Sequence, residues 1–364
     1  MRVSGSVLLV LLCAVVAPNT VACTQAPERA AAPATETSVV LPVPGFHHMH
    51  INSVDPADSL DWWQNFWPKG TVTEIAGFPA FSGDGVHLLY TQVDRQAPGG
   101  FMPALFRSEP QSAFWTTGPD TDGLALYERL TALDPEGERF NFLPVYTGPD
   151  DTEGVPHSGL GPFGDQLRTV AEIEALNGVP TERGPNSQDF GYLVDPDGLL
   201  VEFNGNAETI DNFYAHTHFW HEDPLCAVDW YVENLGLGAF SASTPRDGPC
   251  DVELGPVSYP TFIPEGQLRQ PIGVVRPSNG VWAWYTRQCR VGRCGQTEHR
   301  PLGSSRGQVM DHVGLTYPDL DVVMIHLAAK GVPVVEGPYP FGETRAVLIE
   351  DLDGLALELI EMPE

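Results

Sequence analysis

The sequence has few basic residues. Lysine and arginine number 19 against 48 aspartates and glutamates, which gives a formal net charge of −29. A negative field of that size repels phosphate backbones and anionic lipid headgroups, and no basic stripe offsets it. The composition therefore argues against a nucleic-acid-binding protein.

The hydrophobic run at the N-terminus is too short to span a bilayer. Arg2 is followed by "VLLVLLCAVV", and the run ends at the small-residue site "TVAC". This pattern predicts a signal peptide over residues 1–22 and export to the periplasm or the cell surface. "TVAC" is also similar to the bacterial lipoprotein signal, in which Cys23 becomes the lipidated first residue. Residues 23–44 are rich in Ala, Pro and Thr, which predicts a disordered tether suited to a lipid anchor.

Cysteine is scarce, with six residues in the whole chain. Two of them lie in or directly after the predicted signal peptide, and the others are Cys226, Cys250, Cys289 and Cys294. An even number in an exported chain favours disulfides. The spacing "CRVGRC" could also indicate a metal knuckle, but a second matching pair is absent, so we expect disulfides of open connectivity.

What the sequence does contain is a long-range repeat. At 364 residues the chain is long enough for two domains. The pattern H-x-H-x4-D-P-x4-D-W occurs at residues 48–62 and again at residues 216–230, every position being 168 residues further on. A repeat at this separation indicates a duplicated unit and not local structure.

Two further pairs of segments extend the duplication. "VPHSGLGPFGDQLRTVAEIEALNGVPTERGP" aligns with "MDHVGLTYPDLDVVMIHLAAKGVPVVEGP", which places His157 over His312. "DPDGLLVEF" at residues 195–203 aligns with "DLDGLALEL" at residues 351–359, which places Glu202 over Glu358. The chain therefore has the order A-B-A′-B′.

Each quarter of the chain predicts a β-α-β-β-β module. "FHHMHINS" is a strand, and the Asp-Pro step after it opens a helix with helical spacing of apolar residues. We expect "SAFWTT" to close the first module as a strand, and "LRTVAEIEALN" and "VVMIHLAAKG" to be the helices of the second and fourth. The Asp-x-Asp-Gly turns then feed a final strand in those two modules. The fold class is α+β, with four tandem modules.

These residues resemble the vicinal oxygen chelate superfamily, which includes glyoxalase I, bleomycin-resistance proteins and extradiol dioxygenases. The resemblance rests on a histidine seven residues before a helix-opening Asp, and on a Glu seven residues after the Asp of the Asp-Pro-Asp-Gly turn. In that family two modules pair into an open eight-stranded cup with a metal inside. The resemblance implies two such cups, one formed by residues 45–208 and one by residues 209–364.

The resemblance also implies the metal ligands. A first-row divalent metal that performs substrate chemistry is commonly held by imidazole nitrogens and one carboxylate, with other positions left open. The expected sets are His48, His157 and Glu202 in the first cup, and His216, His312 and Glu358 in the second. Extradiol dioxygenases are most similar, because glyoxalase I adds a second Glu on the fourth strand of a module. Neither "SAFWTT" nor "VWAWYT" offers that carboxylate.

Several further residues are candidates at the rim of these sites. His50 and His218 share a strand face with the expected ligands, so they are candidates to contact substrate, to support a ligand or to replace one. By the same alternation, His47 should point away to the surface.

Two residues are candidates for catalysis by resemblance to extradiol dioxygenases. His299 lies in the region of their acid-base histidine, although the surrounding "RCGQTEHRPLG" reads as a loop. Tyr192 in "GYLVDPDG" supplies their aromatic hydroxyl in the first half, whereas Leu348 occupies that place in the second. Because the first half has no counterpart of His299, we expect the second cup to be the more catalytic one.

The resulting hypothesis is an exported metal-dependent enzyme whose small-molecule substrate chelates the metal through neighbouring oxygens. A dioxygenase using Fe(II), favoured over Mn(II) or Zn(II), is the first reading. A non-redox lyase or isomerase of the glyoxalase type is the alternative within the same fold. The alternative outside catalysis is a protein that binds or sequesters a small molecule.

The N-terminal pattern makes a prediction about the mature protein. We expect cleavage before Cys23 and a lipid on that cysteine, because the apolar run ends in a lipoprotein-like site. Intact-mass measurement on protein from the membrane fraction checks this. An unmodified Cys23, or a retained Met1, would contradict the lipoprotein interpretation.

Overall fold

The computed structural model describes residues 40–98, 114–121, 123–140, 142, 190–205, 213–221, 224–239, 272–286 and 302–362. The predicted signal peptide and most of the predicted tether lie outside these residues, as do His157 and His299. Export and lipidation therefore stay predictions.

In three of the four expected modules, the structure describes one helix and four strands. The first comprises β1 (Gly45–Ser53), α1 (Pro56–Phe66), β2 (Thr71–Ile75), β3 (Phe78–Gly83) and β4 (Val86–Gln92). The third comprises β8 (Phe213–His221), α4 (Pro224–Leu235), β9 (Gly238–Ala239), β10 (Ile272–Arg276) and β11 (Val281–Thr286). The fourth comprises β12 (Met310–Tyr317), α5 (Leu320–Lys330), β13 (Glu336–Phe341), β14 (Thr344–Glu350) and β15 (Ala356–Glu361). The α+β class is confirmed.

The second module is described in part. Its elements are β5 (Phe114–Thr121), α2 (Gly123–Leu133), β6 (Phe190–Val194) and β7 (Leu200–Gly205). Phe142 forms an isolated bridge with Leu193 of β6, in the place that β13 takes beside β14 in the fourth module. The prediction that "SAFWTT" closes the first module is wrong, because β4 is already its fourth strand and Phe114 opens β5 of the second.

The helix starts follow from local sequence. Asp55 caps α1 by accepting a hydrogen bond from the backbone N–H of Asp58, and Pro56 occupies the first turn. Asp319 caps α5 in the same way through the N–H of Val322. Both carboxylates satisfy helix N–H groups that have no partner inside the helix. The predicted helix start at the Asp55-Pro56 step is confirmed.

The modules assemble into two sheets in an order that differs from the order of the chain. Sheet A has eight strands in the order β13-β14-β15-β12-β1-β4-β3-β2, and so joins the first module to the fourth. Sheet B has seven described strands in the order β6-β7-β5-β8-β11-β10-β9, and so joins the second module to the third. The prediction that residues 45–208 and 209–364 would each form one cup is therefore wrong.

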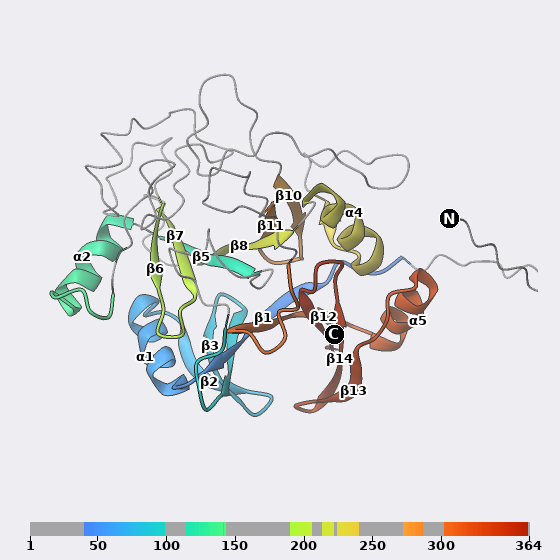
Figure 1. Cartoon of the computed structure of the whole chain (residues 1–364), viewed down its shortest axis with the longest axis horizontal. Helices are drawn as coiled ribbons and strands as arrows, with labels where there is room; N and C mark the ends of the chain where they lie inside the picture. Colours follow the sequence, from blue (N-terminus) through green and yellow to red (C-terminus); the bar gives the residue numbers. More distant parts are fainter. Residues whose placement is uncertain are drawn as a thin grey trace, which may run out of the picture. The chain divides into compact units, whose positions relative to one another are not determined.

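The pairing of first strands decides this arrangement. β1 runs antiparallel to β12 at the centre of sheet A, as β5 does to β8 in sheet B. Within a module the first strand is parallel to the last, as β1 is to β4 and β12 to β15. Figure 1 shows the blue first strand beside the red final quarter of the chain. Every module offers the same first-strand edge, so chain order does not dictate which two edges meet.

Residues 40–44 do not belong to a tether. Leu41 is 7% exposed and forms part of the hydrophobic core. The carbonyl of Pro44 accepts a hydrogen bond from the N–H of Ser278, which precedes β11. The predicted tether is therefore too long at its C-terminal end, because Leu41 packs with the core.

Cys226 in α4 is disulfide-bonded, as expected for an exported chain. Every other cysteine lies outside the described residues. The connectivity therefore stays open.

The repeated Asp-x-Asp-Gly turns join modules that are neighbours in the chain but belong to different sheets. Asp195 follows β6, and its carboxylate accepts from the Trp63 indole of α1 (3.2 Å). Asp351 follows β14, and its carboxylate accepts from the Tyr231 hydroxyl of α4 (2.8 Å). Trp63 and Tyr231 are 168 residues apart and thus occupy equivalent positions in the repeat. The same buried contact is made twice with different donors.

Burial makes these carboxylates sensitive to their partners. Burial raises the pKa of Asp195 to about 8, with a further rise from Asp197, while the hydrogen bond from Trp63 lowers it. Burial also raises the pKa of Asp351, and the hydrogen bond from Tyr231 opposes that rise. An acid that is buried in this way costs free energy unless donors satisfy it.

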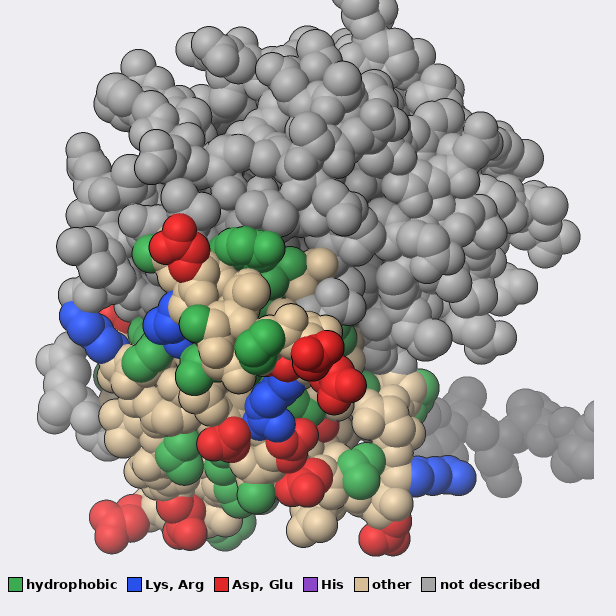
Figure 2. Space-filling view, turned by 90° about the vertical axis from the view of Figure 1, so that its left-hand side faces the viewer, with side chains coloured by type: hydrophobic (Ala, Val, Ile, Leu, Met, Phe, Trp, Pro, Cys, Tyr) green, Lys and Arg blue, Asp and Glu red, His purple; other side chains and the backbone are tan. Residues whose placement is uncertain are grey.

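The surface of the described residues is mixed. Figure 2 shows acidic side chains scattered over the face it draws, with hydrophobic side chains between them. Among the described residues, no helix is both long enough and apolar enough to cross a bilayer.

The turn contact predicts the effect of two matched substitutions. Tyr231→Phe should lower the free energy of unfolding by about 1–3 kcal/mol, because buried Asp351 loses a donor. Tyr90→Phe is the control, since the Tyr90 hydroxyl is buried without a hydrogen-bond partner among the described residues. We expect that control to be neutral or slightly stabilising. Chemical denaturation checks both, and equal effects would contradict the role given to Tyr231.

Candidate metal centre

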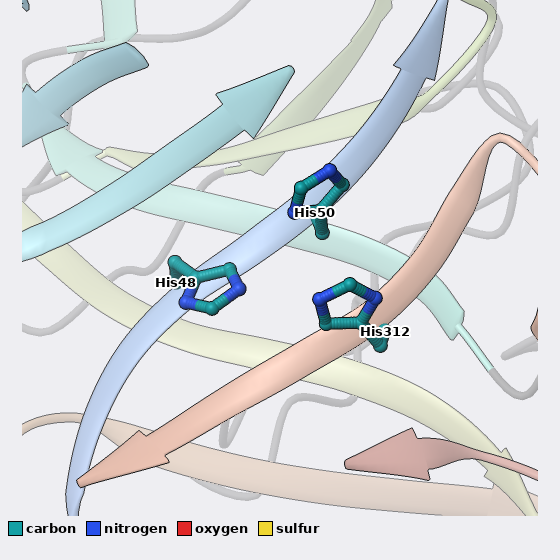
Figure 3. Close-up of side chains that lie close together, drawn as sticks. All are labelled: His48, His50 and His312. Carbon is teal, nitrogen blue, oxygen red and sulfur yellow. The ribbon is translucent and has the colours of Figure 1, made fainter. Parts of the chain in front are cut away.

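Each sheet gathers a cluster of metal-ligating side chains at its centre. The sheet A cluster comprises His48, His50, His312 and Glu358, and the sheet B cluster comprises Glu202, His216 and His218. In sheet A, ligand atoms within 4.8 Å of one another are offered by His48, His50 and His312. In sheet B, the same holds for Glu202, His216 and His218. Figure 3 shows the imidazoles of sheet A facing one another across β1 and β12.

Three atoms of the sheet A cluster converge. The Nε2 atom of His48 lies 3.5 Å from Oε2 of Glu358, and the Nε2 atom of His312 lies 4.0 Å from the same oxygen. The His48 and His312 rings are at 83° to each other, with centroids 5.5 Å apart. Two imidazoles and one carboxylate thus meet from β1, β12 and β15.

These three atoms share an unusual environment. His48 Nε2, His312 Nε2 and Glu358 Oε2 are all buried and have no hydrogen-bond partner among the described residues. Leaving one buried polar atom unsatisfied costs about 1–3 kcal/mol. Three such atoms around one point fit a divalent cation, which would satisfy all of them together.

The remaining polar atoms of two of these residues are held by neighbours. Asp311 Oδ1 lies 2.7 Å from Nδ1 of His312, and Arg306 pairs with the same carboxylate at 3.1 Å. The Tyr339 hydroxyl donates to Oε1 of Glu358 at 2.7 Å. Such partners fix the orientation of metal ligands and the nitrogen that carries the proton.

His47 is buried next to His48, so the prediction that it points to the surface is wrong. It is 8% exposed, and its Nδ1 lies 2.9 Å from Nδ1 of His48. The reason is a β-bulge, because the pairing of β1 with β12 passes from Phe46 directly to His48. The extra residue breaks the alternation of faces on which the prediction relied.

Burial favours the neutral, metal-binding form of His48 and His50. Burial lowers the pKa of His48 well below its ordinary value, and neighbouring His47 and His312 lower it further. Burial likewise lowers the pKa of His50 to about 3, with His312 adding to the shift. Burial raises the pKa of Glu358, an effect that His312 and the Tyr339 hydrogen bond oppose.

His50 does not share the arrangement of the other two imidazoles. Its ring stacks on that of His312 at 4.5 Å and 25°, and its Nε2 lies 2.7 Å from the Thr91 hydroxyl. The lone pair of an imidazole lies in the ring plane, so two stacked rings cannot both aim at one ion. We therefore assign His50 to the wall of the site and not to the ligand set.

Gly314 on β12 makes room for His48. A Cβ at this position would lie 2.3 Å from Nδ1 of His48. The register places Gly314 directly opposite His48 and beside Glu358. A glycine is needed here because the ring of His48 lies against the β12 backbone.

The sheet B cluster repeats part of this geometry. His216 Nε2 lies 3.3 Å from Oε1 of Glu202, and His218 Nδ1 lies 3.6 Å from Oε2. Burial lowers the pKa of His218 to about 3, an effect that Glu202 opposes. Thr116 of β5 stands opposite His218, as His312 stands opposite His50, so the place of the third ligand is taken by a threonine.

Solved structures with a related architecture exist. No protein-family model matches the sequence, and no curated protein matches it. Glyoxalase I from Zea mays matches with a TM-score of 0.51 and 13% identity, over 87% of this chain and 92% of its own. A mutant of the same maize enzyme matches with a TM-score of 0.52 and 13% identity, over 88% and 94%. The chain has the vicinal oxygen chelate fold.

The two ligand sets expected for this fold were grouped wrongly. His48 does not meet Glu202, which lies in sheet B, and His216 does not meet His312 or Glu358, which lie in sheet A. The error follows from the expected pairing of modules in chain order. His48, His312 and Glu358 come together instead. The more complete set of donors therefore contains two ligands expected in the second cup, His312 and Glu358, but not His216.

One expected ligand and two catalytic candidates need separate comment. His157 and His299 lie outside the described residues. The position equivalent to His312 on β5 is held by Thr116, and the role expected for His157 stays a prediction. Tyr192 stands opposite Glu202 in the pairing of β6 with β7, and its catalytic role stays a prediction.

Sequence reasoning missed Asp311 and Tyr339. Asp311 directly precedes the expected ligand His312, and this adjacency in the sequence could have predicted a carboxylate partner for the imidazole. Tyr339 lies on β13, and only the pairing of β13, β14 and β15 brings it to Glu358.

The close approach at Gly314 predicts a loss of metal binding on substitution. Gly314→Ala should displace the His48 ring and lower the free energy of unfolding by about 1–3 kcal/mol through overpacking. Metal affinity should fall with it, as measured by competition with a chromophoric chelator. Gly303→Ala is the control, because a Cβ there meets nothing within 4 Å. Unchanged metal affinity in Gly314→Ala would contradict the placement of His48.

Proposed function

We propose that the chain is a metal-dependent enzyme whose active site is the sheet A cluster. The observation that carries the proposal is the convergence of three buried, unsatisfied donor atoms on one point. His48, His312 and Glu358 would hold the ion. A divalent metal in such a set acts as a Lewis acid or activates oxygen for a substrate bound at its open positions.

The protein groups around the ion have separate roles in this proposal. Asp311 orients His312, and Tyr339 holds Glu358. His50 and Thr91 line the wall beside His312, where a bound substrate would contact them. We propose a small molecule with two adjacent oxygens as the substrate, since such a ligand fills two neighbouring positions of one metal.

Within this class we favour a dioxygenase-like reaction with Fe(II), over Mn(II) or Zn(II). The supporting observation is the number of donors. On β15, the last strand of the fourth module, Glu358 pairs with Gly314 of β12. On β4, the last strand of the first module, the equivalent residue is Leu89, which pairs with His50 of β1. Leucine has no donor atom, so the second carboxylate that glyoxalase I uses is missing at this place. A lyase or isomerase of the glyoxalase type is the second candidate, because it uses the same open face.

The sheet B cluster would bind metal less tightly. It keeps a carboxylate and two histidines, but Thr116 replaces the imidazole that β12 supplies in sheet A. A hydroxyl is a weaker ligand than an imidazole for first-row divalent metals. A protein that only sequesters a small molecule would not need the buried donors of the sheet A cluster, and we therefore rank that function below an enzyme.

Matched carboxylate substitutions test the site. Glu358→Gln removes the only charged donor of the sheet A cluster and should abolish tight binding of one divalent ion per chain. Glu202→Gln changes the equivalent carboxylate of sheet B and should leave that ion in place. Elemental analysis after gel filtration, with circular dichroism to confirm folding, measures both. Retention of the ion in Glu358→Gln and its loss in Glu202→Gln would sink the assignment.

The same proteins test the reaction. Protein loaded with Fe(II) would be assayed for oxygen consumption with a series of catechols, and for conversion of 2-oxoaldehydes. Oxygen uptake that Glu358→Gln loses and Glu202→Gln keeps would support the dioxygenase. Conversion of 2-oxoaldehydes without oxygen uptake would favour the lyase or isomerase. If protein that holds its ion shows neither oxygen uptake nor conversion of 2-oxoaldehydes, both proposed reactions are contradicted.

A further inference from the structure

The contact between His47 and His48 is the feature of the sheet A cluster that the proposed function leaves unexplained. Two imidazole Nδ1 atoms lie 2.9 Å apart, so one must donate a hydrogen and the other accept it. Both rings are buried, at 8% exposure for His47 and 0% for His48. Burial next to another imidazole is costly unless the hydrogen bond is made.

The contact is built by a bulge, and a second bulge mirrors it. In β1 the extra residue is His47, directly before His48. In β12 the pairing passes from His312 to Met310, so the extra residue is Asp311, directly before His312. His48 and His312 hold equivalent places, because each stands seven residues before the Asp that caps the next helix. Each bulge therefore places one side chain beside the Nδ1 of one proposed ligand.

Sheet B has the same bulges with different residues. The pairing of β5 with β8 skips Ala215, directly before His216, and Trp115, directly before Thr116. Neither alanine nor tryptophan carries a side-chain acceptor. The acceptors that His47 and Asp311 supply at the bulge positions of sheet A are therefore not supplied by the same positions of sheet B.

We propose that His47 is a positioning residue that holds His48 in the tautomer able to bind the metal. The inference rests on the proposed function. A neutral His48 that binds through Nε2 must carry its proton on Nδ1, and His47 accepts that hydrogen bond through its own unprotonated Nδ1. His47 thus does for His48 what Asp311 does for His312, with a neutral acceptor in place of a carboxylate.

The surroundings fix the ring of His47 in the orientation this requires. Its ring packs edge-on against His87 at 4.8 Å and against Phe341 at 5.6 Å. His87 is in turn held by Ser82, whose hydroxyl lies 2.9 Å from its Nδ1. These contacts keep the ring of His47 beside that of His48.

Three substitutions at one position separate an acceptor from a space-filling side chain. His47→Leu fills much of the volume without an acceptor, and should weaken metal binding by about 10- to 100-fold, as is typical when such a partner is lost. His47→Asn keeps an acceptor atom in the place of Nδ1 and should bind metal nearly as tightly as the wild type. His47→Asp gives His48 a carboxylate partner like Asp311 and should bind more tightly than the wild type. His326→Leu is the control and should change the affinity little, because His326 lies on α5 and bonds to the backbone oxygen of Glu233, outside the sheet A cluster.

Affinity for Zn(II) and Co(II) would be measured by competition with a chromophoric chelator on the full chain, with folding confirmed by circular dichroism. The proposal is supported if metal affinity is highest in His47→Asp, lower and similar in the wild type and His47→Asn, and lowest in His47→Leu. Equal losses in His47→Asn and His47→Leu would show that only packing matters and overturn it. Wild-type affinity in His47→Leu would overturn it as well. If the wild-type protein binds no metal at His48, the proposed function is contradicted, and with it the basis of this proposal.

Discussion

Antiparallel pairing of β1 with β12 brings strands from opposite ends of the chain to the centre of one sheet, and the candidate metal centre depends on that pairing. His48 and His312 meet only because these strands are neighbours, and Glu358 joins them because β15 lies on the far side of β12. The backbone hydrogen bonds of the two strands therefore hold the donor atoms in register. Loss of this pairing would separate the donors even if every module stayed folded.

The polar character of this centre is a cost that the rest of sheet A must offset. Met49 and Ile51 point to the other face of β1 and belong to the hydrophobic core, while the histidines occupy the face of the site. Buried donors without partners destabilise the protein by themselves, and a bound cation would relieve that cost. Stability and metal binding are in this way linked through the same atoms.

Duplication explains why the two sheets look alike, and divergence explains why they differ. Trp63 and Tyr231 meet equivalent aspartates with different donor groups, so the contact between neighbouring modules has been kept while its chemistry changed. In the two clusters the reverse has happened. The strand register is the same, yet Thr116 stands where sheet A has His312, and Ala215 stands where sheet A has His47. The same backbone thus supports one full set of donors and one reduced set.

The amino-acid sequence by itself determined the module, the repeat and the kinds of ligand. Helix starts at Asp55 and Asp319 follow from capping, and the strand-borne histidines and the Glu after each Asp-x-Asp-Gly turn are visible as patterns. Only the tertiary structure decided which modules pair, because every module carries a similar first strand and the choice depends on packing between distant elements. The extra residues His47 and Asp311 were equally hidden, since a bulge appears only when two strands are laid side by side. Local sequence sets what a strand can offer, and the partner strand decides which of its side chains meet.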